Sequence, residues 1–275
     1  MTAASGFAIA LDGCSRLHWE ATGAGDPVLL IAGLGLGGGA WWRTVPVLAQ
    51  RLRVITFDGR GVGRSRALSY AYTTDAMADD AAAVLDAVGV ERAHVYGISL
   101  GGMVAQVLTL RHPERVRSLV LGATSPGGPR AVRPSAEVTA FFRRRPRMEA
   151  EEAAWESVPI NYGARCRAEH PERIDEDVAR RLAHPLSEQA YRAQLFAAAW
   201  HNCLGALSRI EVPTMVVHGA LDRVIPVANA HLIAERVRGA RLRVLKEAGH
   251  LYPTEAPEVD RAIARFFADR RPEAA

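Results

Sequence analysis

Hydrophobic residues along this chain follow two different spacings. Short apolar runs rich in β-branched residues end at Gly, Pro or Asp, and the longer stretches between them repeat apolar residues at intervals of three and four. The first pattern is typical of buried strands and the second of amphipathic helices. The predicted strands are Phe7 to Ala10, Arg16 to Ala21, Pro27 to Ala32, Arg53 to Phe57, Ala93 to Ile98, Arg117 to Leu121, Thr214 to His218 and Arg241 to Lys246. The predicted helices are Trp41 to Arg51, Thr74 to Val88, Leu100 to Arg111, Ala228 to Val237 and Pro257 to Arg270.

The order of these segments predicts an α/β fold. The first two strands are close enough in sequence to form an antiparallel hairpin. Helical segments separate most of the later strands, and connections of that length join parallel neighbours. We therefore expect a mainly parallel eight-stranded sheet with flanking helices.

The alternation stops after Thr124 and returns only with the strand that begins at Thr214. Residues 126–209 carry helical periodicity without a convincing strand. Because the sheet needs the segments on both sides to complete its core, we expect an insertion and not an independent domain. The predicted core is 1–125 with 210–275, and residues 126–209 form a helical cap, or lid, named the cap segment below.

Composition and charge indicate a folded globular protein and argue against several other classes. The chain has 275 residues, 49% of them hydrophobic, which is enough for a sizeable core. Although the net charge is +4, Lys246 is the one lysine and most arginines alternate with acids, so no nucleic-acid partner is expected. Three widely spaced cysteines indicate neither a disulfide framework nor a metal site. No leader or membrane-spanning run is visible, and we expect a cytoplasmic monomer or homodimer without a membrane partner.

A candidate nucleophile lies between a predicted strand and a predicted helix. The run Gly97-Ile98-Ser99-Leu100-Gly101 matches G-x-S-x-G, a pattern that short chains also contain by accident. The strand before it and the helix after it are typical of a nucleophile elbow, in which flanking glycines give room for a strained serine. The alternative is a serine that only caps the helix.

A serine hydroxyl needs a histidine base held by an acid, in the order Ser, Asp or Glu, His for this type of elbow. His250 stands in the loop between the last strand and the last helix, and Asp222 follows the strand ending at His218. Both positions are at the carboxyl edge of a parallel sheet, where ligands bind. His218 and His94 are interpreted as structural, and Asp58 as part of a polar loop.

Two backbone N–H groups are expected to hold the oxyanion of an acyl-transfer intermediate. Leu100 follows the nucleophile, and Leu34 stands in the glycine-rich loop after an earlier strand. The same loop, Gly33 to Gly38, also matches the dinucleotide pattern G-x-G-x-x-G, with Asp58 about twenty residues further on. Nucleotide binding would leave the order of Ser99 and its partners unexplained, so we expect no cofactor.

These motifs together resemble the α/β-hydrolase superfamily in order and spacing. The motifs are the loop at Leu34, the run Asp58 to Ser65, the elbow at Ser99, Asp222 before Pro226, and Gly249-His250 followed by Glu255-Ala256-Pro257. The cap segment and the run around the elbow are similar to 3-oxoadipate enol-lactonase-like and small carboxylesterase members. One departure is Ala32-Gly33, where many members have His-Gly. Dehalogenases and epoxide hydrolases of this superfamily have aspartate at the nucleophile position, so serine favours acyl chemistry.

The sequence therefore predicts a serine hydrolase of carboxylic esters or lactones that needs no metal. Aromatic residues Trp42, Phe142 and Trp200 are expected to bind a small-molecule substrate with an apolar portion. The run Arg143 to Arg145 could recognise a carboxylate, but such runs are usually solvated. Carbon–carbon bond hydrolysis, perhydrolysis, acyl transfer or a lyase step on the same triad stay open. A hydrolase-like ligand receptor is a further alternative.

Overall fold

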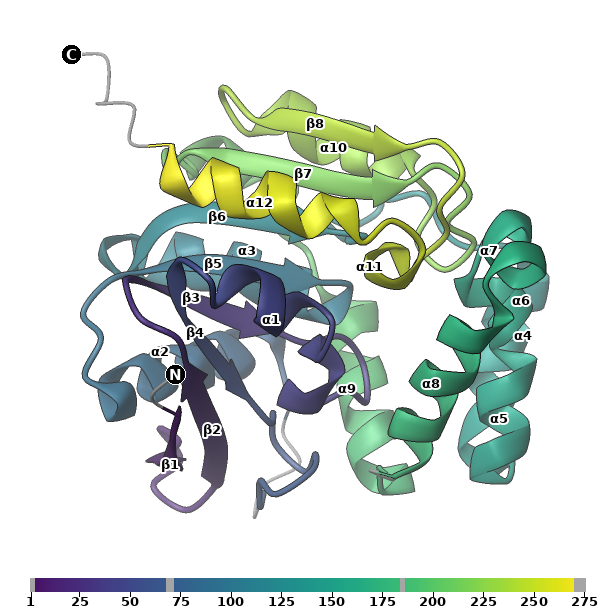
Figure 1. Cartoon of the computed structure of the whole chain (residues 1–275), viewed down its shortest axis with the longest axis horizontal. Coiled ribbons are helices and arrows are strands. Elements are labelled where there is room, and N and C mark those ends of the chain that lie inside the picture. Colours follow the sequence, from purple (N-terminus) through teal and green to yellow (C-terminus); the bar gives the residue numbers. More distant parts are fainter. Residues whose placement is uncertain (1–2, 68–71, 184–185, 270–275) are drawn as a thin grey trace.

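The computed structural model describes residues 3–67, 72–183 and 186–269. Eight strands form one sheet (Figure 1). The strands are β1 (Ala3–Ile9), β2 (Arg16–Thr22), β3 (Asp26–Ile31), β4 (Leu52–Phe57), β5 (Ala93–Ile98), β6 (Val116–Gly122), β7 (Thr214–Gly219) and β8 (Arg241–Leu245).

The sheet has the strand order β1-β2-β4-β3-β5-β6-β7-β8. β1 pairs antiparallel with β2, where Phe7 faces His18, and β2 pairs antiparallel with β4. Every other neighbouring pair is parallel. The predicted hairpin and the mainly parallel eight-stranded sheet are therefore confirmed.

Helices cover both faces of this sheet because its central strands are apolar on both sides. In β3, Leu29 and Ile31 belong to one apolar cluster, and Val28 and Leu30 belong to another. The first cluster lies under α2 (Thr74–Val88), α3 (Leu100–Arg111) and α10 (Ala228–Arg236). The second lies under α1 (Thr44–Leu48) and α12 (Glu258–Ala268), which pack together (Figure 1).

One predicted helix differs from the structure. The expected helix from Trp41 to Arg51 is a short 3-10 helix, η1 (Gly38–Trp41), followed by α1. Pro46 explains the later start, because proline lacks an N–H and is accommodated in the first turn of a helix, where no intrahelical acceptor is needed. The other core helices begin and end within two residues of the expected positions.

The cap segment is helical in its described residues and contributes no strand to the sheet there. Its two ends meet, because Gly127 and Asn202 form an isolated bridge and Cys203 N donates to Pro126 O over 2.8 Å. Figure 1 shows α4 to α8 gathered beyond the carboxyl ends of the parallel strands. The elements are α4 (Ala136–Arg144), η3 (Arg145–Arg147), α5 (Ala150–Glu156), α6 (Val158–Asn161), α7 (Ala164–Glu169), α8 (Pro171–Leu182), α9 (Glu188–Trp200) and η4 (Leu207–Arg209).

Candidate active site

Ser99 occupies a sharp turn between β5 and α3. Its backbone has φ 57° and ψ −121°, and Ala123 is the other non-glycine residue with positive φ in the described part of the chain. Two glycines permit the turn: a Cβ on Gly97 would collide with the carbonyl of Gly101, and a Cβ on Gly101 would collide with the carbonyl of Ile31. The elbow geometry expected from the sequence is therefore present.

His250 joins Ser99 to Asp222. Its Nε2 lies 3.0 Å from Ser99 Oγ, and its Nδ1 lies 2.8 Å from Asp222 Oδ2. The loop after β8 carries the histidine, and the turn after β7 carries the aspartate. His250 and Asp222 are each 6% exposed, so little water competes for these hydrogen bonds. The three residues predicted to act together form one continuous line of contacts.

Asp222 is held as an anion. Its Oδ1 accepts the backbone N–H groups of Val224 and Ile225, both over 2.8 Å. Burial on its own raises the pKa of Asp222, but the charge of His250 and hydrogen bonds from His218 and His250 lower it to about 2. An ionised carboxylate can only accept, so His250 Nδ1 is the donor. The bare Nε2 is then free to accept the Ser99 proton.

His218 contributes to this site as well as to the core. Its Nε2 donates to Ile225 O over 2.8 Å and lies 3.2 Å from Asp222 Oδ2. The sequence analysis interpreted His218 as a buried structural histidine and did not identify its contact with Asp222. The spacing of four residues between the two, across the end of a strand, could have indicated that contact. His94, also interpreted as structural, lies 2.8 Å from Ser118 Oγ.

The glycine-rich loop passes directly beside the nucleophile. A Cβ on Gly33 would lie 3.2 Å from Ser99 Cβ, and Leu34 is the next residue of this loop. Gly35 N donates to Gln194 Oε1 over 2.8 Å, which ties the loop to α9. Leu100 is the first residue of α3, where an N–H has no intrahelical acceptor and the helix dipole favours negative charge.

Asp58 is turned toward this same loop and not toward His250. Its Oδ1 accepts Gly38 N over 2.8 Å, and its Oδ2 accepts Arg64 N over 2.9 Å. The carboxylate thus satisfies backbone donors, as the polar-loop interpretation expects. These bonds use the oxygens that a ribose would need in the dinucleotide interpretation.

A cavity of about 500 Å³ adjoins the elbow and the histidine loop. Ile98 and Leu251, the neighbours of Ser99 and His250, line it, and so does Trp42. The indole of Trp42 lies between two guanidinium groups, those of Arg43 and Arg180, at 3.9 and 4.0 Å from the ring centre.

Two other aromatic residues expected at the substrate site lie elsewhere. Phe142 packs beside Val138 and Ile160 in a small cluster within the cap segment. Trp200 is 74% exposed, and its ring contacts Phe196 at 5.7 Å between centres. Neither lines the cavity, so the prediction for these two residues is wrong. Their hydrophobicity does not specify which side of a helix faces the substrate.

Glu255 fastens the histidine loop to the cap segment, a role that the sequence analysis did not identify. Its Oε1 accepts Gly249 N over 2.7 Å and its Oε2 accepts Gly163 N over 2.8 Å. Leu251 N donates to Asn161 O over 3.1 Å. The pKa of Glu255 is raised overall, because the effect of burial exceeds the opposing effect of the two backbone donors. The cap loop therefore supports His250 from both of its neighbours.

Two further observations concern residues 3–67, 72–183 and 186–269. No group of three or more His, Cys, Asp or Glu side chains there has a geometry that could hold a metal ion. No helix in these ranges is both long and apolar enough to cross a membrane.

Comparison with known proteins gives relatives of several activities. The chain is 33% identical over 255 residues to an Azorhizobium caulinodans protein with the provisional name carbamate hydrolase, covering 90% of this chain and 92% of that protein. It is also 33% identical to the 2-hydroxymuconate semialdehyde hydrolase of a Pseudomonas species, covering 86% and 84%. A thermophilic esterase from Thermogutta terrifontis superposes with a TM-score of 0.81 at 29% identity, covering 96% and 98%.

The family itself follows from the extent of these matches. The family model of the alpha/beta hydrolase fold matches residues 26–257, which include the elbow, the acid turn and the histidine loop. The chain therefore belongs to the alpha/beta hydrolase fold family.

Proposed function

We propose that the protein is a serine hydrolase that cleaves a carboxylic ester or a lactone through an acyl-enzyme. The observation that carries this proposal is the line of contacts from Ser99 Oγ through His250 to Asp222, at 3.0 and 2.8 Å. The first distance allows the Ser99 proton to pass to His250, and the second allows Asp222 to orient and stabilise the histidine.

The geometry supports a two-step reaction. Ser99 Oγ attacks the acyl carbon while its proton moves to His250 Nε2, and Asp222 stabilises the resulting imidazolium. The N–H groups of Leu34 and Leu100 hold the oxyanion of the tetrahedral intermediate. The intermediate collapses when the leaving alcohol takes the proton from His250. Water then attacks the acyl-enzyme and gives a proton to His250. When this second intermediate collapses, Ser99 Oγ takes that proton back and the acid product leaves.

The cavity favours a substrate with an apolar portion. Ile98, Leu36 and Leu251 contribute apolar surface near the nucleophile, and Trp42 adds an indole. We propose that the cap segment acts as a lid over this space, because Asp177 on α8 and the oxyanion loop line the same cavity.

A second reaction on the same residues is carbon–carbon bond hydrolysis. The observation that favours it is the 33% identity to a protein named 2-hydroxymuconate semialdehyde hydrolase. That chemistry uses the same side chains, so the substrate screen below must include vinylogous diketones.

The test is labelling by a fluorophosphonate followed by a substrate screen. We expect the wild-type protein to be labelled at Ser99 and the Ser99→Ala variant to be unlabelled, since the probe reacts only with an activated serine. Esters, lactones and vinylogous diketones are then compared by kcat/KM. Labelling at another serine, or turnover that survives in Ser99→Ala, would overturn the proposal. Turnover of diketones alone would assign the second reaction.

A further inference from the structure

An arginine without an ionic partner lines the cavity. Arg181, on α8, is partly buried, and its Nη1 donates to Ser157 Oγ over 3.0 Å. Ser157 is itself 3% exposed, and its hydroxyl donates to Ala154 O over 2.7 Å. In the described part of the chain, no carboxylate oxygen lies within 4.0 Å of the Arg181 guanidinium. The side chain that it contacts directly by a hydrogen bond is therefore a neutral hydroxyl and not a carboxylate.

The acid one helical turn earlier is already engaged. Asp177 Oδ1 accepts Trp42 Nε1 over 3.3 Å and Arg43 Nε over 3.4 Å, and Oδ2 accepts the Tyr162 hydroxyl over 3.0 Å. Arg43 is shared between two acids, because it lies 2.7 Å from Glu176 and 3.4 Å from Asp177. Asp177 thus does not pair with Arg181, and the cavity wall keeps one cation in excess at this point.

A second arginine strengthens the positive field. The Arg145 guanidinium lies 4.4 Å from the centre of the Tyr191 ring, and a Cβ on Gly35 of the oxyanion loop would lie 3.9 Å from that ring. Burial lowers the pKa of Arg181; the charge of Arg145 adds to this effect, while Tyr162 and the charge of Asp177 oppose it. By contrast, the preceding Arg144 is ion-paired with Glu156.

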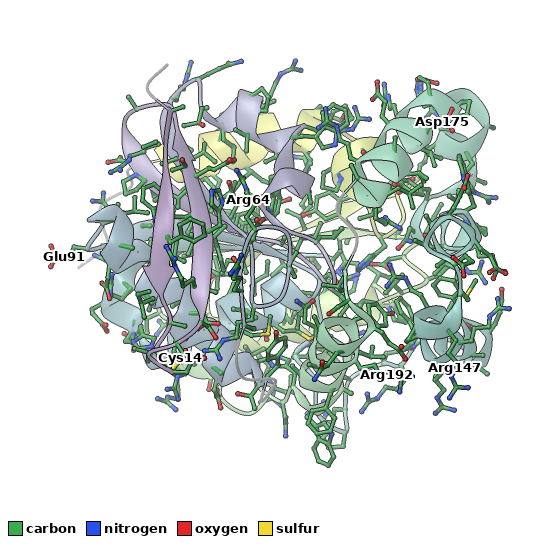
Figure 2. The ribbon with its side chains drawn as sticks, turned by 90° about the horizontal axis from the view of Figure 1, so that it is seen from below. Cys14, Arg64, Glu91, Arg147, Asp175 and Arg192 are labelled. Carbon is green, nitrogen blue, oxygen red and sulfur yellow. The ribbon has the colours of Figure 1, made fainter. Side chains whose placement is uncertain are left out.

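A partly buried charge without an ionic partner is costly unless an anion binds to it. Elsewhere in the cap segment, arginines have partners or lie in solvent. Arg192 pairs with Glu188, and Figure 2 shows Arg192 and Arg147 at the periphery of the molecule. Two arginines of the cap segment line the cavity: Arg180 is exposed and stacks on Trp42, whereas Arg181 is partly buried and has no ionic partner among the described residues.

We propose that Arg181 is a subsite for a carboxylate of the substrate. The substrate class is then a monoester or lactone that carries a free carboxylate, with its reacting carbonyl at Ser99. Guanidinium groups suit this ligand because their fork of N–H donors matches the two carboxylate oxygens. This inference rests on the proposed ester or lactone hydrolysis for its reacting group, but anion binding itself does not require turnover.

The first arm of the test compares charged and neutral esters. The charged probes are p-nitrophenyl monoesters of succinic, glutaric and adipic acid, and the neutral probes are the same compounds with the free acid methylated. A charge-assisted hydrogen bond contributes about 1.5–3 kcal/mol, so the best charged ester should exceed its methylated partner roughly 10- to 100-fold in kcat/KM. We expect Arg181→Met to bring that ratio close to one, mainly through KM, and Arg181→Lys to keep part of it.

Arg192→Met is the matched control, because it removes the same charge from the cap segment at an exposed position. It should keep the wild-type ratio; loss of the ratio in this variant as well would mean that net charge, and not the subsite, steers the substrate. A wild-type preference for every methylated ester would overturn the subsite while leaving the serine hydrolase intact.

The second arm is independent of turnover. Calorimetry measures binding of monomethyl glutarate and monomethyl adipate to Ser99→Ala, with and without Arg181→Met. Binding that weakens at least 10-fold in the double variant supports the subsite even if Ser99 of the wild type proves unreactive. No difference between the two proteins, with melting temperatures that match, would overturn it.

Discussion

The backbone strain at Ser99 predicts an unusual order of stability between two inactive variants. Ser99→Gly and Ser99→Ala both remove the nucleophilic hydroxyl and differ only in the Cβ. At φ 57° and ψ −121° a Cβ is sterically unfavourable, and such conformations cost about 1–3 kcal/mol for a non-glycine residue. Glycine escapes that cost but loses about 0.5–1 kcal/mol more conformational entropy on folding than alanine. The glycine variant should therefore be more stable by roughly 0.5–2 kcal/mol.

Equilibrium unfolding in urea, followed by circular dichroism, measures the difference. The control is Ala179→Gly on the exposed side of α8, where glycine should lower the free energy of unfolding by about 1 kcal/mol. Opposite signs at positions 99 and 179 are the expected result. If Ser99→Gly were less stable than Ser99→Ala by the amount seen at position 179, the elbow would not be strained.

Three further predictions concern the acid of the triad, a buried carboxyl group and two tryptophans. Asp222→Asn should lower kcat roughly 10⁴-fold, because the amide oxygen takes the two backbone donors and its NH₂ group forces His250 into the wrong tautomer. Wild-type kcat would place the acid elsewhere. Burial raises the pKa of Asp260 to about 7. Between about pH 4 and 7 the folded protein therefore keeps a proton that the unfolded chain loses, and its stability falls as the pH rises through this range. Asp260→Asn should abolish that slope in urea unfolding and stabilise the protein at pH 8 by up to about 4 kcal/mol; an unchanged slope would refute the assignment. Trp42→Ala should raise KM for bulky esters, whereas Trp200→Ala should leave it within about twofold; the reverse would show that Trp200 reaches the substrate.

The parts of this site that sequence predicts are those set by local structure and chain order. The turn at Ser99 requires Gly97 and Gly101, so a run of five residues is enough to predict the elbow. Strand ends place Asp222 and His250 at one edge of a parallel sheet, which makes their meeting with Ser99 predictable from topology.

The parts that sequence does not predict depend on which side of a cap helix faces inward. Phe142 and Trp200 are apolar but lie outside the cavity wall, whereas the charged Arg181 lies in it. The sequence alone does not show whether an arginine in the run Arg180-Arg181 faces solvent or the cavity. That depends on how α8 packs against Trp42. The roles of His218 and Glu255 likewise emerge only from contacts across the fold.

The bridge made by Glu255 between Gly163 and Gly249 limits how this protein can be recombined. Exchanging the whole cap segment for that of a relative would replace the chain at 161–163, whose backbone N–H and carbonyl must be correctly placed to brace the loop of His250. A chimaera could then bind a new substrate and still hydrolyse it slowly. Specificity is better transplanted by replacing α8 and α9 alone, with 161–163 kept from the parent.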